Sequence, residues 1–131
     1  MSVSLVPKHP ARTLVLDLKV EGQPLPKARA RVTGRGAYTP ERNLKNELML
    51  EWHMKTRVPN PVRGDLIVDV DFFRSDQRQC DLDNLVKQIF DAANGVVWND
   101  DSQIICLYAQ KLFDKSRPRT ELRVWKIVEA G

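Results

Sequence analysis

Alternation of apolar and polar positions predicts four strands in the chain. The strand-like runs lie at residues 13–20, 65–73, about 103–113 and about 120–128. In the second run the apolar side chains share one face, so Asp69 and Asp71 fall on the other face and are expected to point to solvent. The last two strands are joined by a turn at residues 115–119, and we expect them to form a hairpin.

Apolar residues spaced three or four apart predict two helices. The clearer helix covers residues 81–93 and ends at Asn94-Gly95, where a chain readily leaves the helical conformation. Its apolar stripe consists of Leu82, Leu85, Val86, Ile89, Phe90 and Ala93. The other helix covers residues 40 to about 56. Its apolar positions are Leu44, Leu48, Met49 and Trp52. Each of these amphipathic helices needs a sheet face to cover.

The predicted elements follow one another in the order β-α-β-α-β-β. Helices that alternate with strands predict an α/β (α+β) fold, in which a mixed sheet is covered by the two helices. A length of 131 residues fits one core, so we interpret residues 1–131 as a single domain. The segment 21–40, rich in Gly, Pro, Arg and Lys, is predicted to be a long loop.

Charge is distributed unevenly along the chain. The formal net charge is +4, with eleven Lys and Arg against five Asp and Glu in residues 1–60, and ten against twelve in residues 61–131. A basic surface suits a polyanion, and an acidic centre suits a divalent cation. Together they favour an enzyme that holds a phosphate backbone over a bound metal. The alternative is an ordinary charged surface, which a net charge of +4 alone does not exclude.

Two features argue against other classes of protein. No apolar run approaches the roughly 20 residues of a membrane-spanning helix. Residues 1–10 also lack a signal-peptide pattern, so we expect a cytoplasmic protein that makes no membrane contact. Cys80 and Cys106 lie neither in a C-x-x-C pair nor near a histidine at ligand spacing, so zinc binding is not expected.

Aspartates gather around the clearer helix. Asp81 and Asp83 stand at its entry, and Asp100 and Asp101 immediately precede a strand, where a turn could bring Asp101 beside the helix start. Mg²⁺ prefers such oxygen ligands, and one or two carboxylates with phosphate oxygens satisfy it. Like charges repel unless a cation joins them, so four aspartates favour a metal site.

A second interpretation of these aspartates is structural. An aspartate before a helix commonly caps it, and residues 99–101 (Asn-Asp-Asp) resemble a polar turn. The residues alone do not choose between Asp100 and Asp101 as a ligand. Asp69 and Asp71 remain possible outer ligands.

Lysines and arginines flank the acidic residues. Lys87 follows Asp83 by four residues on the same helix face, where it could stabilise charge on a phosphate, and Asp91 is expected to hold Lys87. A ladder of surface ion pairs is the alternative. Six further cations are expected to bind DNA. They are Lys27, Arg29, Arg31 and Arg35 in the front loop, and Arg74 and Arg78 before the first aspartate. A solvated basic loop is the other interpretation of the front segment.

Two segments resemble one known family. Residues 81–103, DLDNLVKQIFDAANGVVWNDDSQ, are similar to the signature of the RusA family of Holliday junction resolvases, and residues 22–40, GQPLPKARARVTGRGAYTP, resemble the basic loop of its phage and prophage members. The resemblance implies a homodimeric, Mg²⁺-dependent endonuclease that cuts four-way DNA junctions. It assigns Asp81 and Asp83 as the paired catalytic aspartates, Asp101 as the third, and Lys87 as the lysine needed for cleavage.

The expected reaction is metal-assisted hydrolysis of a phosphodiester, with Asp81, Asp83 and Asp101 as metal ligands and Lys87 on the phosphate. Mn²⁺ is expected to replace Mg²⁺, because both prefer oxygen ligands. A two-fold dimer would present two matching sites to the two strands of a junction. The alternatives are a less selective nuclease for branched DNA and a DNA-binding module without catalysis.

Overall fold

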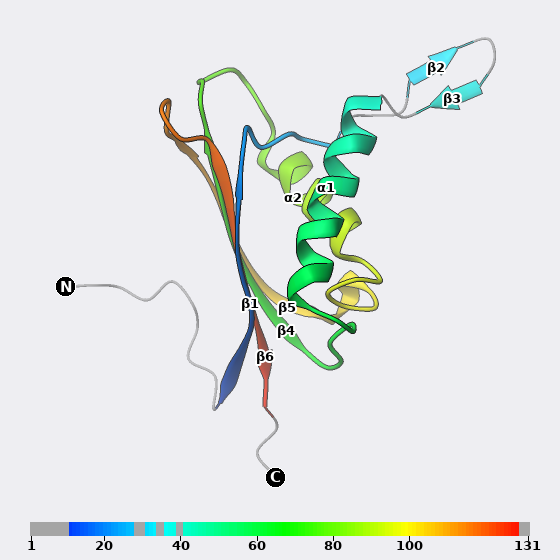
Figure 1. Cartoon of the computed structure of the whole chain (residues 1–131), viewed down its shortest axis with the longest axis vertical. Coiled ribbons are helices and arrows are strands. Elements are labelled where there is room, and N and C mark those ends of the chain that lie inside the picture. The colour runs from blue at the N-terminus through cyan, green and yellow to red at the C-terminus, as the bar shows by residue number, and fades with distance from the viewer. Residues whose placement is uncertain (1–10, 28–30, 34–35, 39–40, 129–131) are drawn as a thin grey trace.

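The computed structural model describes residues 11–27, 31–33, 36–38 and 41–128 and has the predicted order of elements (Figure 1). The strands are β1 (Arg12–Glu21), β2 (Arg31–Thr33), β3 (Gly36–Tyr38), β4 (Leu66–Arg74), β5 (Ile104–Phe113) and β6 (Arg119–Ile127). The helices are α1 (Glu41–Arg57) and α2 (Leu82–Ala93), and a short 3₁₀ turn, η1 (Asp101–Gln103), precedes β5. The α+β prediction is confirmed. The antiparallel pair β2 and β3 is an addition inside the predicted loop.

Four strands form one mixed sheet in the order β1-β6-β4-β5. β4 and β5 are parallel because α2 crosses between them, whereas β6 is antiparallel to both of its neighbours. The predicted hairpin of the last two strands is therefore wrong, since β6 pairs with β1 and β4 instead of β5. Burial explains the difference: Leu122 and Val124 of β6 are 1% and 0% exposed in the middle of the sheet.

The two helices cover one face of the sheet, as Figure 1 shows. Between the layers, Leu66, Val68, Val70 and Phe72 of β4 are each at most 1% exposed, which confirms their predicted shared face. α2 packs its apolar stripe against them, with Leu85, Ile89 and Ala93 buried. Among the described residues, neither helix is long and apolar enough to cross a lipid bilayer.

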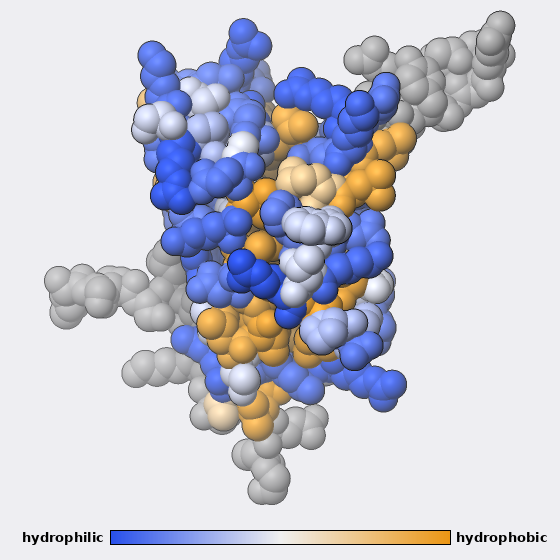
Figure 2. Space-filling view, in the orientation of Figure 1, coloured by the Kyte–Doolittle hydropathy of each residue, from blue (hydrophilic) through white to orange (hydrophobic). Residues whose placement is uncertain are grey.

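The apolar positions of α1 are not the positions that this helix buries. Leu48 and Trp52 are each 63% exposed, and Figure 2 shows an apolar patch over the N-terminal half of α1. The helix instead buries Leu50 and Met54. Part of the inner side of α1 is polar, because Asn43 donates a hydrogen bond to the carbonyl of Pro26 in the segment that follows β1. The spacing of apolar residues alone therefore does not identify the buried face of this helix.

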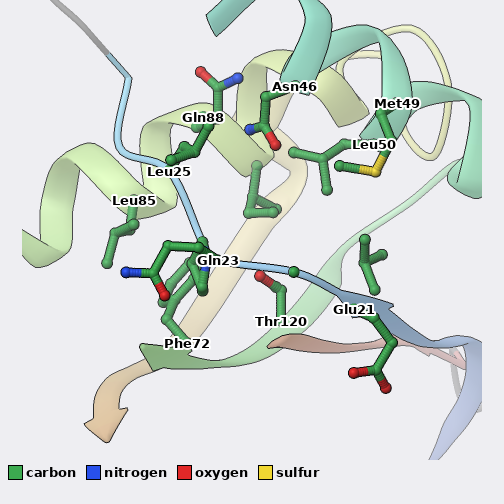
Figure 3. Close-up of a pocket in the computed structure, with 14 residues that line it drawn as sticks. Glu21, Gln23, Leu25, Asn46, Met49, Leu50, Phe72, Leu85, Gln88 and Thr120 are labelled. Atoms are coloured by element: carbon green, nitrogen blue, oxygen red, sulfur yellow. The ribbon is translucent and has the colours of Figure 1, made fainter. Parts of the chain in front are cut away.

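Residues 22–27 form a strap that ties the end of β1 to both helices and to the end of β4. Arg74 donates from Nη1 to the carbonyl of Pro24 at 2.7 Å, and Asn43 donates from Nδ2 to the carbonyl of Pro26 at 2.8 Å. The strap closes a cavity against the helices and the sheet (Figure 3). The cavity volume of about 40 Å³ admits only a few waters, and no predicted site residue lines it, so this cavity is not a substrate site.

Candidate functional site

The amino-terminal end of α2 presents two carboxylates that have no partner among the residues described by the structure. Asp81 occupies the position before the helix with an extended backbone (φ −75°, ψ 128°), but its side chain accepts no hydrogen bond from the helix. Asp83, in the first turn, is exposed. Within the described part of the chain, neither carboxylate has a hydrogen-bond or ion-pair partner. Asp81 therefore occupies the N-cap position of α2 without using its carboxylate as a cap.

Lys87 lies one turn after Asp83 and is likewise exposed. Its ammonium group has no partner among the residues that the structure describes. The prediction that Asp91 holds Lys87 is wrong, because Asp91 Oδ2 lies 3.1 Å from Lys27 Nζ instead. The strap brings Lys27 to the side of α2 that faces α1, so Lys87 remains available for a ligand.

Two neighbouring aspartates beyond the other end of α2 differ in their contacts. Asp100 accepts a hydrogen bond from the N–H of Ser102 at 3.1 Å and completes a capping box with Gln103. Hydrogen bonds from Ser102 lower the pKa of the Asp100 carboxyl. The carboxylate of Asp101 is exposed and has no partner among the described residues. The structure thus separates a capping Asp100 from an unpaired Asp101, a choice that the spacing alone left open.

Asp101 does not lie beside the start of α2 in the same chain, so that expectation is wrong. The 12 residues of α2 span about 18 Å at 1.5 Å per residue. Asp81 precedes this helix, whereas Asp101 precedes β5, whose first residue Ile104 pairs with the first residue of β4, Leu66. Within the described ranges, no group of three or more His, Cys, Asp or Glu side chains lies close enough to hold a metal ion. One chain supplies the predicted ligands in two separate places.

Two cations predicted to bind DNA are engaged inside the protein. Lys27 contacts Glu47 of α1 at 3.3 Å and Asp91 of α2 at 3.1 Å. Burial opposes its charge, but the hydrogen bonds to Asp91 and Glu47 outweigh this effect and raise the pKa of the Lys27 ammonium. Arg74 is 9% exposed and holds the strap through Pro24. Both residues position the base of the front loop.

The other predicted DNA-binding cations lie further out. The Arg78 side chain is exposed, and its guanidinium has no partner in the described part of the chain. Arg29 and Arg35 lie outside the described residues, as does the side chain of Arg31. Among the predicted DNA-binding cations whose side chains the structure describes, Arg78 is the one whose charge is available to a ligand.

Lys111 of β5 stands next to the acidic end of α2, and the spacing analysis missed it. Its Nζ donates a hydrogen bond to the carbonyl oxygen of Cys80, the residue directly before Asp81. The two residues are 31 positions apart in the chain, so no local motif contains both. The signal in the sequence is limited to a lysine within a mostly apolar strand, and a lysine is common on any edge strand.

The open face of the sheet, opposite the helices, carries the remaining candidate ligands in ion pairs. Arg123 Nη2 of β6 lies 3.1 Å from Asp69 Oδ2 and 2.9 Å from Asp71 Oδ2. Arg119 Nε lies 2.7 Å from Glu121 Oε2 in the same strand. These carboxylates have protein cations as partners, so their contacts do not favour a role as outer metal ligands.

Comparison with known protein families gives one match. The family described as "Endodeoxyribonuclease RusA" matches residues 21–125, which is most of the chain and includes both ends of α2. A search among curated proteins gave no significant match.

Proposed function

The chain belongs to the RusA family of endodeoxyribonucleases, so it is a Holliday junction resolvase of DNA recombination and repair, and we propose that it uses Mg²⁺ held by Asp81, Asp83 and Asp101. The observation that carries this proposal is the set of carboxylates at the two ends of α2 that have no partner in the described part of the chain. On the open face, the carboxylates of Asp69, Asp71 and Glu121 each meet an arginine instead.

The residues present fit a divalent cation. Asp81 and Asp83 offer only carboxylate oxygens, which suit Mg²⁺ or Mn²⁺ and do not suit a soft metal. When bound, the ion would supply an acidic water and neutralise charge on the phosphate. The chain's own part is to hold the carboxylates two residues apart on a rigid helix start and to present the Lys87 ammonium to the phosphate, where it stabilises developing negative charge.

A second copy of the chain is required to gather the three aspartates. In an isologous two-fold pair, each protomer offers the same surface, so two antiparallel α2 helices place the end of one beside the start of the other. Asp101 of one protomer then joins Asp81 and Asp83 of its partner. This arrangement yields two identical sites related by two-fold symmetry, which matches the symmetric cleavage of two strands in a junction.

The surface next to α2 supports such a pair. β5 is an edge strand of the sheet, and exposed edges are normally covered. Its large apolar side chains Ile105, Leu107 and Phe113 are 51%, 41% and 51% exposed. On α2, Leu82 and Phe90 are only half-buried. An apolar edge of this kind is typical of a protein interface.

We further propose that residues 1–131 form one nuclease domain acting in the cytoplasm of a bacterial or phage-infected cell, where its DNA substrate is found. β1 lies almost entirely before the matched residues 21–125, yet it pairs with β6 along its length and shares the same sheet. The front loop, with Arg29, Arg31 and Arg35, is proposed to bind the arms of the junction together with Arg78, while Lys27 and Arg74 hold the base of that loop.

The test of the function is a cleavage assay with four-way junction, fork and linear duplex, each with Mg²⁺, Mn²⁺ or a chelator. We expect paired symmetric cuts in the junction that depend on the metal. Equal cutting of forks and junctions would replace the proposal with a less selective branched-DNA nuclease. Tight binding without any cutting would leave a DNA-binding module.

Mixing two inactive variants tests the shared site. Asp83→Asn and Asp101→Asn should each be inactive alone. If each site combines residues of both protomers, a mixed dimer has one intact site and one doubly altered site, so an equal mixture should recover about a quarter of the wild-type sites and make single nicks. If each site belonged to one chain, no mixed dimer would have an intact site and the mixture would stay inactive.

A further inference from the structure

A recess lies beside the acidic end of α2, between the end of β4, the loop after it and β5. Its lining residues are Arg74, Asp76, Gln77, Arg78, Gln79, Lys111, Leu112 and Phe113. Three of these side chains carry a positive charge and one carries a negative charge. Its volume of about 210 Å³ is room for several waters, so a phosphate group fits where a base pair does not.

Lys111 connects this recess to the carboxylates. Its ammonium group donates one hydrogen bond to the carbonyl of Cys80, which leaves donors for an outside acceptor. Because Cys80 directly precedes Asp81, the charge of Lys111 lies within one residue of the first proposed metal ligand. Lys87 is exposed on α2 one turn after Asp83, so a second lysine follows the same pair of aspartates along the chain.

The two arginines of the recess differ in burial and in their contacts. Arg74 lies at the end of β4, bonded to Pro24 and 3.6 Å from Asp76. Its Nε is buried and has no hydrogen-bond partner among the described residues. Arg78 is exposed and its guanidinium is unpaired there. A buried N–H without an acceptor is costly, and an anion in the recess adds acceptor oxygens beside it.

We propose that this recess binds one backbone phosphate next to the scissile phosphate, with Lys111 and Arg78 as its contacts and Arg74 as a positioning residue. The inference rests on the proposed function, because it assumes that the scissile phosphate lies at Asp81 and Asp83. A phosphate contact of this kind carries no base specificity, but it sets the register of the strand over the carboxylates. It would be the same for every sequence that the enzyme cuts.

The experiment compares wild type with Lys111→Met and Lys111→Arg, and with Lys19→Met as the matched control, because Lys19 is an exposed lysine of β1 on the opposite edge of the sheet. Junction binding is measured at several salt concentrations, and single-turnover cleavage is measured with saturating Mg²⁺. Lys111→Met should weaken binding by roughly tenfold at low salt and reduce the slope of log K against log salt by about one. Lys111→Arg should retain most of the affinity, and Lys19→Met should behave as wild type.

The contact is then located with junctions that carry one neutral methylphosphonate at each position around the cut. We expect one position at which the neutral linkage weakens wild type but has no further effect on Lys111→Met. If Lys111→Met cut slowly but bound with an unchanged salt slope, and no position showed this loss of additivity, Lys111 would only brace Cys80 and the inference would be overturned. Failure of wild type to cut any junction would instead reject the proposed function.

Discussion

Two groups of carboxylates in this protein have opposite surroundings. On the open face of the sheet, Asp69 and Asp71 share Arg123, with N–O distances of 3.1 and 2.9 Å. At the ends of α2, Asp81, Asp83 and Asp101 meet no cation among the described residues. The paired group joins β4 to β6 and so serves the fold. The unpaired group makes no hydrogen bond or ion pair through its carboxylates with the residues that the structure describes, which leaves these carboxylates available to bind something from outside.

This difference predicts that the two groups respond oppositely to neutralisation, and Asp83→Asn should give the largest effect. Loss of one proposed metal ligand should lower the rate of junction cleavage by a factor on the order of a thousand. The melting temperature should not fall, because the change removes a charge that has no partner and stands beside Asp81. Single-turnover cleavage and thermal unfolding of the same preparation measure both quantities. A fall in stability with retained cleavage would reverse the assignment of the two groups.

On the open face we expect the reverse result. Arg123→Met leaves Asp69 and Asp71 as neighbouring like charges, so the free energy of unfolding should fall by about 1–2 kcal/mol while cleavage persists. Urea unfolding measures the change. Arg117→Met is the matched control, because its ion pair with Glu21 is highly exposed, with side chains 57% and 58% accessible, and should leave stability unchanged. Equal losses in both variants would show that burial does not separate these pairs.

The smallest expected effect is a loss of folding stability at low pH, when the paired carboxylates become protonated. The hydrogen bond from Arg119 lowers the pKa of Glu121 below its ordinary value of 4.5. A lowered pKa in the folded state contributes stability that is present above the unfolded value and is lost as the pH falls through the folded value. Wild type should therefore lose more stability than Arg119→Met when the pH falls from 7 to about 4. Parallel pH profiles for the two proteins would remove this ion pair from the stability of the sheet.

Local patterns predicted much of the fold because both helices and the four long strands have a period that depends only on neighbouring residues. β4 is the clearest case, since Leu66 to Phe72 alternate and their apolar members are buried. The same reasoning failed for α1, where Leu48 and Trp52 are exposed, because polar contacts of the strap occupy part of the inner side. Local patterns also failed to predict the partners of β6. This strand pairs with β1 and β4 because its apolar side chains are buried in the middle of the sheet.

The sequence by itself determined the family of this protein, through its long motif, and the residues proposed for its chemistry, which are the Asp-x-Asp pair and the nearby lysine. These features depend only on which residues are present and on short distances along the chain, so they can be recognised without knowing the fold. Only the tertiary structure decided which charges are available. It paired Lys27 with Asp91, gave Asp100 a capping role, and brought Lys111 to Cys80 across 31 residues. It also placed Asp81 and Asp101 at opposite ends of α2, because a helix of 12 residues is a rigid rod, and for that reason we propose that a second copy unites them.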